Sequence, residues 1–193
     1  MLTHLLALAP EDRYLRFGYA ANDAQIRRYV DLLDFDRDEV FGVFNRKLEL
    51  IAMAHLAYLP DSAQTRHAAE FGVSVLPKVR GRGYGARLFD HAVLHARNRH
   101  VDTMIIHALS ENAAMLKIAR NAGATVERDG GESEARLRLP AETFGSVLEE
   151  LVENQAGELD YQLKSHAQRM DGLRRIVGEI KAGIKKVRSS VIE

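Results

Sequence analysis

The hydrophobic pattern divides the chain into a mixed first part and a helical tail. Up to about residue 140, short apolar or alternating runs typical of strands are interspersed with segments whose apolar residues recur every three or four positions. From residue 143 onward only the three-four spacing remains. The sequence therefore predicts an α/β (α+β) domain over residues 1–142 and a long helix within residues 143–193.

The first part reads as an ordered series of elements. Leu2 to Phe17 is predicted to be helical with a break at Pro10, and Asn22 or Asp23 is predicted to cap a helix that runs to Leu33. A further helix follows residue 85, and Ser110 is placed to cap another that Asn112 opens. The predicted strands cover residues 40–44, 48–58, 69–76, 103–109, 124–128 and 134–139. The first three of these strands are expected to form an antiparallel meander.

The segment from Val73 to Gly85, VSVLPKVRGRGYG, leads from a strand into a helix through three alternate glycines. Bare backbone N–H groups and a helix N-terminus both attract phosphate, so this loop predicts a site for a phosphorylated cofactor. A P-loop would need Gly-Lys followed by Ser or Thr, and a dinucleotide site would need the spacing GxGxxG. Neither pattern fits the residues present.

Two motifs in this region resemble those of a known superfamily. Arg80-x-x-Gly83-x-Gly85 looks like the pyrophosphate loop of the GNAT acyltransferases, which bind acetyl-CoA, and NAAMLKIARNAGA from Asn112 resembles their later helix. Three further segments resemble the acetyltransferase domains of bacterial protein-lysine acetyltransferases, and these are PEDRYLRF (10–17), LLDFDRDEVFGVF (32–44) and AEFGV (69–73). The similarity covers roughly residues 5–140. It implies a largely antiparallel mixed sheet flanked by helices, and acetyl transfer from acetyl-CoA to an amine, either a protein lysine or a small molecule.

The resemblance also implies a set of cofactor-binding residues. Backbone groups of one strand would bind the pantetheine arm and polarise the thioester where that strand splays from the next, and the glycine loop would hold the pyrophosphate. These residues are Val73, Val75, Arg80, Gly81, Arg82, Gly83, Tyr84, Gly85 and Asn112.

Direct transfer requires a base, because a lysine ammonium with a pKa of about 10.4 arrives protonated. Glu70 is the candidate, since it lies on the strand entering the cleft and the subgroup uses a glutamate at the matching AEF position. Strand alternation places Glu70 on one face with Gly72 and Ser74, which also fits an ordinary exposed residue. The superfamily usually meets the leaving thiolate with a tyrosine seven residues after the helix-opening asparagine, and here that position is Ala119. A non-catalytic acyl-CoA sensor and an assembly module without a ligand are therefore the alternative hypotheses.

Composition narrows the remaining function classes. The chain has 27 Lys plus Arg and 27 Asp plus Glu, so no basic excess favours nucleic acid. Cysteine is absent, which excludes disulfides and thiolate nucleophiles and agrees with direct transfer. His91 and His95 are four residues apart without an evident third ligand, so no metal is expected. The sequence shows neither a long apolar run nor the basic start of a signal peptide, which favours a cytoplasmic location away from membranes.

The tail carries a seam of apolar residues that predicts a coiled coil. Residues 149–160 hold five acids and no bases, whereas residues 161–188 hold eight bases and two acids. An antiparallel pair would set these opposite charges together, so we expect a homodimer through the tail. Glycines at 157, 172, 178 and 183 favour the alternative, in which the tail folds back on its own domain.

Overall fold

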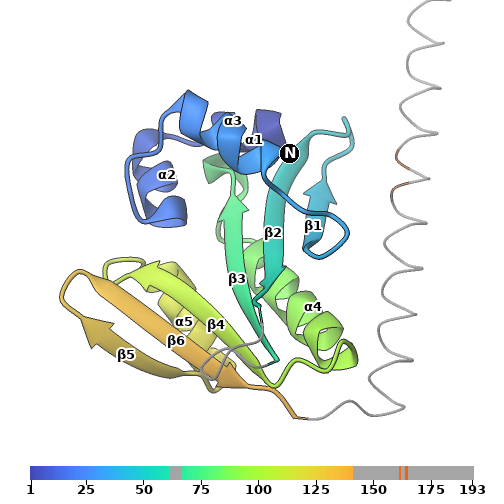
Figure 1. The fold of residues 1–193 in the computed structure, drawn as a ribbon. Helices are drawn as coiled ribbons and strands as arrows, with labels where there is room; N and C mark the ends of the chain where they lie inside the picture. Colours follow the sequence, from blue (N-terminus) through green and yellow to red (C-terminus); the bar gives the residue numbers. More distant parts are fainter. Residues whose placement is uncertain (61–66, 141–160, 162–163, 165–193) are drawn as a thin grey trace, which may run out of the picture.

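The computed structural model of the protein describes residues 1–60 and 67–140 together with Tyr161 and Lys164. Within these residues one sheet has the strand order β1-β2-β3-β4-β6-β5 (Figure 1). Its strands are β1 (Glu39–Phe44), β2 (Leu50–Tyr58), β3 (Ala68–Val75), β4 (Thr103–Leu109), β5 (Thr125–Asp129) and β6 (Glu132–Arg138). Neighbours are antiparallel except β3 and β4, which are parallel. The predicted mixed, largely antiparallel sheet and its opening meander are confirmed.

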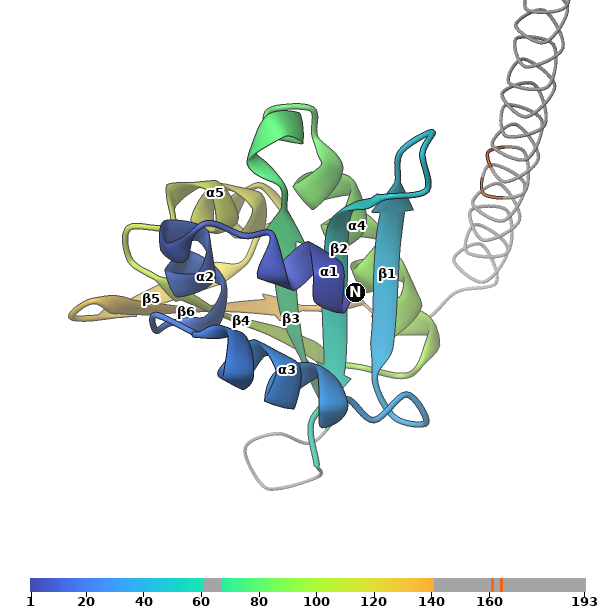
Figure 2. The same cartoon turned by 90° about the horizontal axis from the view of Figure 1, so that it is seen from above.

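Helices cover both faces of the sheet (Figures 1 and 2). One face packs against α1 (Leu2–Leu6), α2 (Pro10–Phe17) and α3 (Asp23–Asp31), and the other against α4 (Tyr84–Asn98) and α5 (Ala113–Asn121). The alternation of β2 divides its side chains between two cores. Ile51 and Met53 join the core beneath α1 and α3, whereas Ala52, Ala54 and Leu56 join the core beneath α4 and α5.

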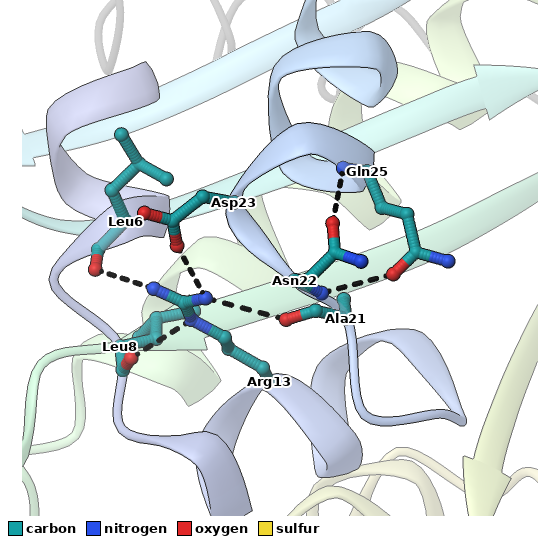
Figure 3. A network of polar contacts seen from close by, with 7 residues as sticks. All are labelled: Leu6, Leu8, Arg13, Ala21, Asn22, Asp23 and Gln25. Carbon is teal, nitrogen blue, oxygen red and sulfur yellow. Dashed lines mark hydrogen bonds and ion pairs between the residues drawn. The ribbon is translucent and has the colours of Figure 1, made fainter.

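A single arginine joins the three N-terminal helices (Figure 3). The guanidinium of Arg13 donates to the carbonyl oxygens of Leu6 at 2.8 Å, Leu8 at 3.0 Å and Ala21 at 3.3 Å. It also pairs with Asp23, the first residue of α3, at 2.7 Å. Of the two predicted caps of α3, Asn22 is the one used. Its side chain and that of Gln25 each accept the other residue's backbone N–H at 2.9 Å, as Figure 3 shows.

Three local expectations were wrong. The strand predicted from residue 48 begins at Leu50, because Leu48 has a left-handed φ of 57° within the turn that closes at Asn45. The helix predicted to reach Leu33 ends at Asp31. Ser110 does not cap α5, since its hydroxyl donates to the carbonyl of Glu132 on β6 at 2.9 Å.

Most of the tail lies outside the described residues, and with it the predicted long helix, the boundary at residue 142 and the pairing of two tails. The ring centroid of Tyr161 is 5.5 Å from that of Phe44 at the end of β1. The ammonium of Lys164 donates to the Phe44 carbonyl at 2.9 Å. In the described part of the chain, no helix has the length and apolar character needed to span a membrane.

Candidate active site

The parallel strands β3 and β4 separate part-way along their length. Only Ala68, Ala69 and Glu70 of β3 pair with β4, and beyond Glu70 the two strands diverge (Figure 1). Helix α2 contacts both strands across this opening. The split forms part of a cavity of about 1290 Å³, which the glycine loop and the start of α5 also line.

The backbone of β3 directs polar groups into the split. The N–H of Leu76 donates to Ile51 on the β2 side, whereas the carbonyl of Val75 accepts from the Nε of Arg80 at 3.1 Å. Backbone groups of alternate residues point to the same edge of a strand. Val73 therefore faces the opening with Val75, and both residues line the cavity.

The glycine loop has the backbone conformation that an anion site requires. A single 3-10 turn over Pro77–Val79, which the sequence did not predict, leads into it. Gly81 and Gly83 adopt positive φ angles of 74° and 79°, and Gly83 is the N-cap of α4. No side chain caps α4 and its first turn holds no acid, so the N–H groups there remain available to a ligand. At Gly85 a Cβ would lie 3.4 Å from the Cδ1 of Ile118, so glycine permits close packing of α4 on α5.

Of the other predicted cofactor-binding residues, some line the cavity and one does not. Arg80 and Tyr84 line it, and the guanidinium of Arg80 also pairs with Asp12 of α2 at 2.5 Å. Arg82 is exposed and is not among the lining residues. Asn112 lines the cavity and caps α5, since its Oδ1 accepts the N–H of Met115 at 3.1 Å.

Glu70 lies at the point where the split begins. Its side chain is half-buried and lines the cavity. No hydrogen bond or ion pair of its carboxylate is found with any residue of 1–60 or 67–140. Ala119, at the position where the resemblance implies a tyrosine, is fully buried in the core under α4 and α5 and does not line the cavity.

A polar network next to Glu70 was missed from the sequence. The guanidinium of Arg16 donates to the hydroxyl oxygen of Tyr29 at 3.1 Å, and that oxygen is 2.7 Å from the Nδ1 of His55. The Nε2 of His55 lies 3.3 Å from the carboxylate of Asp38, which Arg37 also binds at 2.7 Å. These side chains come from four separate elements and loops, so no local motif in the sequence signals the network.

The charges of this network are set by burial and by the pairing of its members. Burial lowers the pKa of His55, which favours the neutral ring. Burial also raises the pKa of Tyr29, which keeps its hydroxyl protonated. For Asp38, burial opposes ionisation, but hydrogen bonds from Arg37 and His55 outweigh it and lower the pKa. A neutral His55 ring with its proton on Nε2, the nitrogen nearer Asp38, would leave Nδ1 to accept from the Tyr29 hydroxyl.

Comparison with known proteins places this geometry in a family. The sequence profile of the Acetyltransferase (GNAT) family matches residues 2–124, which is more than half of the chain. No curated protein matches the chain in sequence. Solved structures do match the chain in fold. In the described residues, no cluster of three or more His, Cys, Asp or Glu side chains could hold a metal ion.

Three of these structures illustrate the likeness. The GNAT domain of a Streptomyces lividans protein named PAT is 22% identical, with a TM-score of 0.60 over 72% of this chain and 82% of that one. A ribosomal-protein-alanine N-acetyltransferase from Brucella melitensis is 20% identical, with a TM-score of 0.57 over 72% and 94%. A phosphinothricin acetyltransferase from Sinorhizobium meliloti, solved with acetyl-CoA, is 13% identical, with a TM-score of 0.57 over 75% and 88%.

Residues 2–124, which the family profile matches, contain β1 to β4, the split between β3 and β4, and the glycine loop. The chain belongs to the acetyltransferase (GNAT) family.

Proposed function

We propose that this protein transfers the acetyl group of acetyl-CoA directly to an amine, with Glu70 as the general base. The observation that carries the proposal is the position of Glu70 at the start of the split, where a half-buried carboxylate faces the cavity. The residues present fit the cosubstrate. Two glycines with positive φ and the uncapped start of α4 suit a pyrophosphate, and the Val73 and Val75 backbone suits the amides of a pantetheine arm.

In the proposed reaction Glu70 removes a proton from the amine, and the backbone of β3 stabilises the thioester carbonyl. Glu70 takes one proton from the substrate ammonium, so that the nitrogen lone pair is free to attack the thioester carbon. In this scheme the N–H of Val73 donates to the carbonyl oxygen as charge develops on it. A C–N bond forms and the C–S bond breaks, and the second proton lost by nitrogen neutralises the departing thiolate. Because a thiol has a pKa of only about 8.5, the thiolate leaves without the tyrosine that Ala119 replaces.

The first test concerns cosubstrate binding. Acetyl-CoA at 100 times its dissociation constant should stabilise the full chain by about 2.7 kcal/mol, measured by thermal or urea unfolding. Gly83→Val should remove this stabilisation, since a side chain there would resist the positive φ and block the approach of phosphate. The matched control is Gly123→Val, because Gly123 also has a positive φ and open space around it but does not line the cavity. A Gly83→Val chain that folds and keeps the full stabilisation would place the cosubstrate elsewhere.

The second test concerns the base. Glu70→Gln should keep acetyl-CoA binding and lower the rate of acetyl transfer by roughly 10²- to 10⁴-fold, measured by thiol release. Unchanged turnover would exclude Glu70 from the reaction. Binding of acetyl-CoA to the unaltered chain without transfer to any amine would instead support the sensor hypothesis.

We also propose that the segment after residue 142 joins two copies of the protein. Support comes from the apolar spacing and opposite charges of the tail, which suit an antiparallel pair of helices.

A further inference from the structure

Arg16 brings a positive charge to the cavity beside Glu70. It belongs to the last turn of α2, is half-buried and lines the cavity. Its guanidinium lies directly over Gly72 of β3, where an added Cβ would come within 2.7 Å of the guanidinium carbon and both terminal nitrogens. Gly72 is not among the glycines with positive φ, so what glycine provides here is the space that the guanidinium occupies. Strand β3 therefore has no side chain at Gly72, the position over which the Arg16 guanidinium lies.

The network behind Arg16 fixes the orientation of its guanidinium. The Tyr29 oxygen accepts from Arg16, because a guanidinium can only donate, and the same oxygen is 2.7 Å from the Nδ1 of His55. The Arg16 guanidinium carbon also lies 5.2 Å from the centroid of the Phe17 ring. A charged side chain held from several sides is a prepared binding group, because little rotamer entropy remains to be lost on binding.

Arg16 lacks an anionic partner in the described part of the chain. None of the ion pairs among these residues includes it, and its only hydrogen bond there is to the neutral hydroxyl of Tyr29. Partly desolvated charges are normally paired, because an unpaired one loses its hydration without compensation. A ligand that carries an anion would complete this site.

The distance between Arg16 and the base limits what that ligand can be. Glu70 and Gly72 are two residues apart on the same strand, so their Cα atoms are about 7 Å apart at a rise of about 3.3 Å per residue. Strand alternation puts Glu70 and the guanidinium over Gly72 on the same face of β3, so a ligand that contacts both needs its amine and its anion only a few bonds apart. The amine and carboxylate of a free amino acid fit this span. A lysine side chain of a protein would instead place its aliphatic stem against the guanidinium.

We propose that the acceptor is a small amine with a carboxylate close to its nitrogen, of the free amino-acid class, and that Arg16 binds this carboxylate. The inference rests on the proposed function, since it assigns the amine to Glu70. The planar guanidinium matches a carboxylate with two parallel hydrogen bonds, and such charge-assisted bonds discriminate strongly against a neutral analogue.

The test compares each acid with its neutral counterpart. The full chain and acetyl-CoA are incubated with common L-amino acids and β-alanine, with the corresponding carboxamides, and with lysine-containing peptides, and thiol release is followed. For at least one pair we expect the acid to be preferred in kcat/KM by about 10- to 100-fold, mainly through KM. Equal or better transfer to the carboxamides, or transfer to the peptides alone, would overturn the proposal.

Three variants connect the preference to Arg16. Arg16→Gln should abolish it, and Gly72→Ala should weaken it while the charge is kept, because the new methyl group displaces the guanidinium. Arg27→Gln is the matched control, since it removes a charge from an exposed position on α3 that does not line the cavity. A preference that survives Arg16→Gln would show that another group reads the carboxylate.

A failure of the proposed acetyl transfer can be told apart from a failure of the Arg16 assignment. A chain that acetyl-CoA does not stabilise has no cosubstrate site, whatever its acceptor. In that case calorimetric titration of the free chain with the same acids and carboxamides still tests Arg16. Acids that bind no better than carboxamides would then contradict the assignment.

Discussion

At the scale of single residues, His4 shows how one buried ring makes stability depend on pH. Its Nδ1 is 2.9 Å from the carbonyl of Leu50 and its Nε2 is 2.8 Å from the hydroxyl of Ser74. The carbonyl can only accept, so Nδ1 carries the proton and Nε2 accepts from Ser74. A neutral ring satisfies both contacts, whereas a second proton on Nε2 would remove the acceptor that Ser74 uses.

The free energy of unfolding should therefore fall as the pH drops below about 6.5. Burial lowers the pKa of His4, and the same cause lowers the pKa of His55, so the unfolded chain binds more protons than the folded one below pH 6.5. Urea unfolding between about pH 5 and 8 should show full stability at the upper end and a loss toward the lower end. His4→Gln should reduce this slope without abolishing it, because His55 remains.

Arg27→Gln supplies the control for this experiment, because Arg27 is exposed on α3. This variant should keep the pH dependence of unfolding of the unaltered chain. A slope that is the same in the His4 and Arg27 variants would show that His4 does not contribute.

The candidate site residues differ in how local their sequence signal is. Glu70 and the glycine loop could be proposed from the sequence, because each belongs to a short contiguous motif that resembles one of the family. Arg16, Tyr29, His55 and Asp38 could not, because the network depends on contacts between residues that are 13 to 26 positions apart. Asp38 illustrates the difficulty. It stands in an acidic stretch of the kind usually found on a protein surface, and yet only 4% of its surface is exposed.

At the scale of elements, periodicity located the strands and helices well but placed some ends wrongly. Side-chain spacing reports which face is buried, whereas an end depends on backbone angles and caps. The left-handed Leu48 delays β2, and the competing partner of Ser110 on β6 leaves Asn112 to cap α5. That β3 splays from β4 near Val73 and Val75 was implied by the resemblance and not by periodicity, and the parallel pairing that ends at Glu70 is seen in the structure alone.

The Arg13 contacts predict how the three N-terminal helices are held. Arg13→Gln should lower the free energy of unfolding by about 2–4 kcal/mol, because three carbonyls and one carboxylate lose a charged donor. Urea unfolding of this variant beside Arg27→Gln, which should change stability by less than about 0.5 kcal/mol, isolates the contribution of the contacts. Equal stabilities in the two variants would refute it.

At the scale of the whole molecule, both hydrophobic cores close within the first part of the chain. Leu139 is the last residue of either core among the described residues. The cavity between β3 and β4 is likewise lined by residues that precede position 140. The two described cores and the lining of the candidate site therefore lie within residues 1–140.

A chain that ends at Glu142 should fold, keep the stabilisation by acetyl-CoA and be a monomer, whereas the full chain should be a dimer. The physical reason is that the apolar seam of the tail needs a partner, and that an antiparallel copy also pairs its acidic half with its basic half. Light scattering at micromolar concentration measures the mass of each chain, and urea unfolding measures its stability. The contacts of Tyr161 and Lys164 with Phe44 define the competing outcome, in which the tail packs on β1 of its own domain. In that case the full chain would be a monomer, and truncation would lower its stability because Phe44 loses this cover.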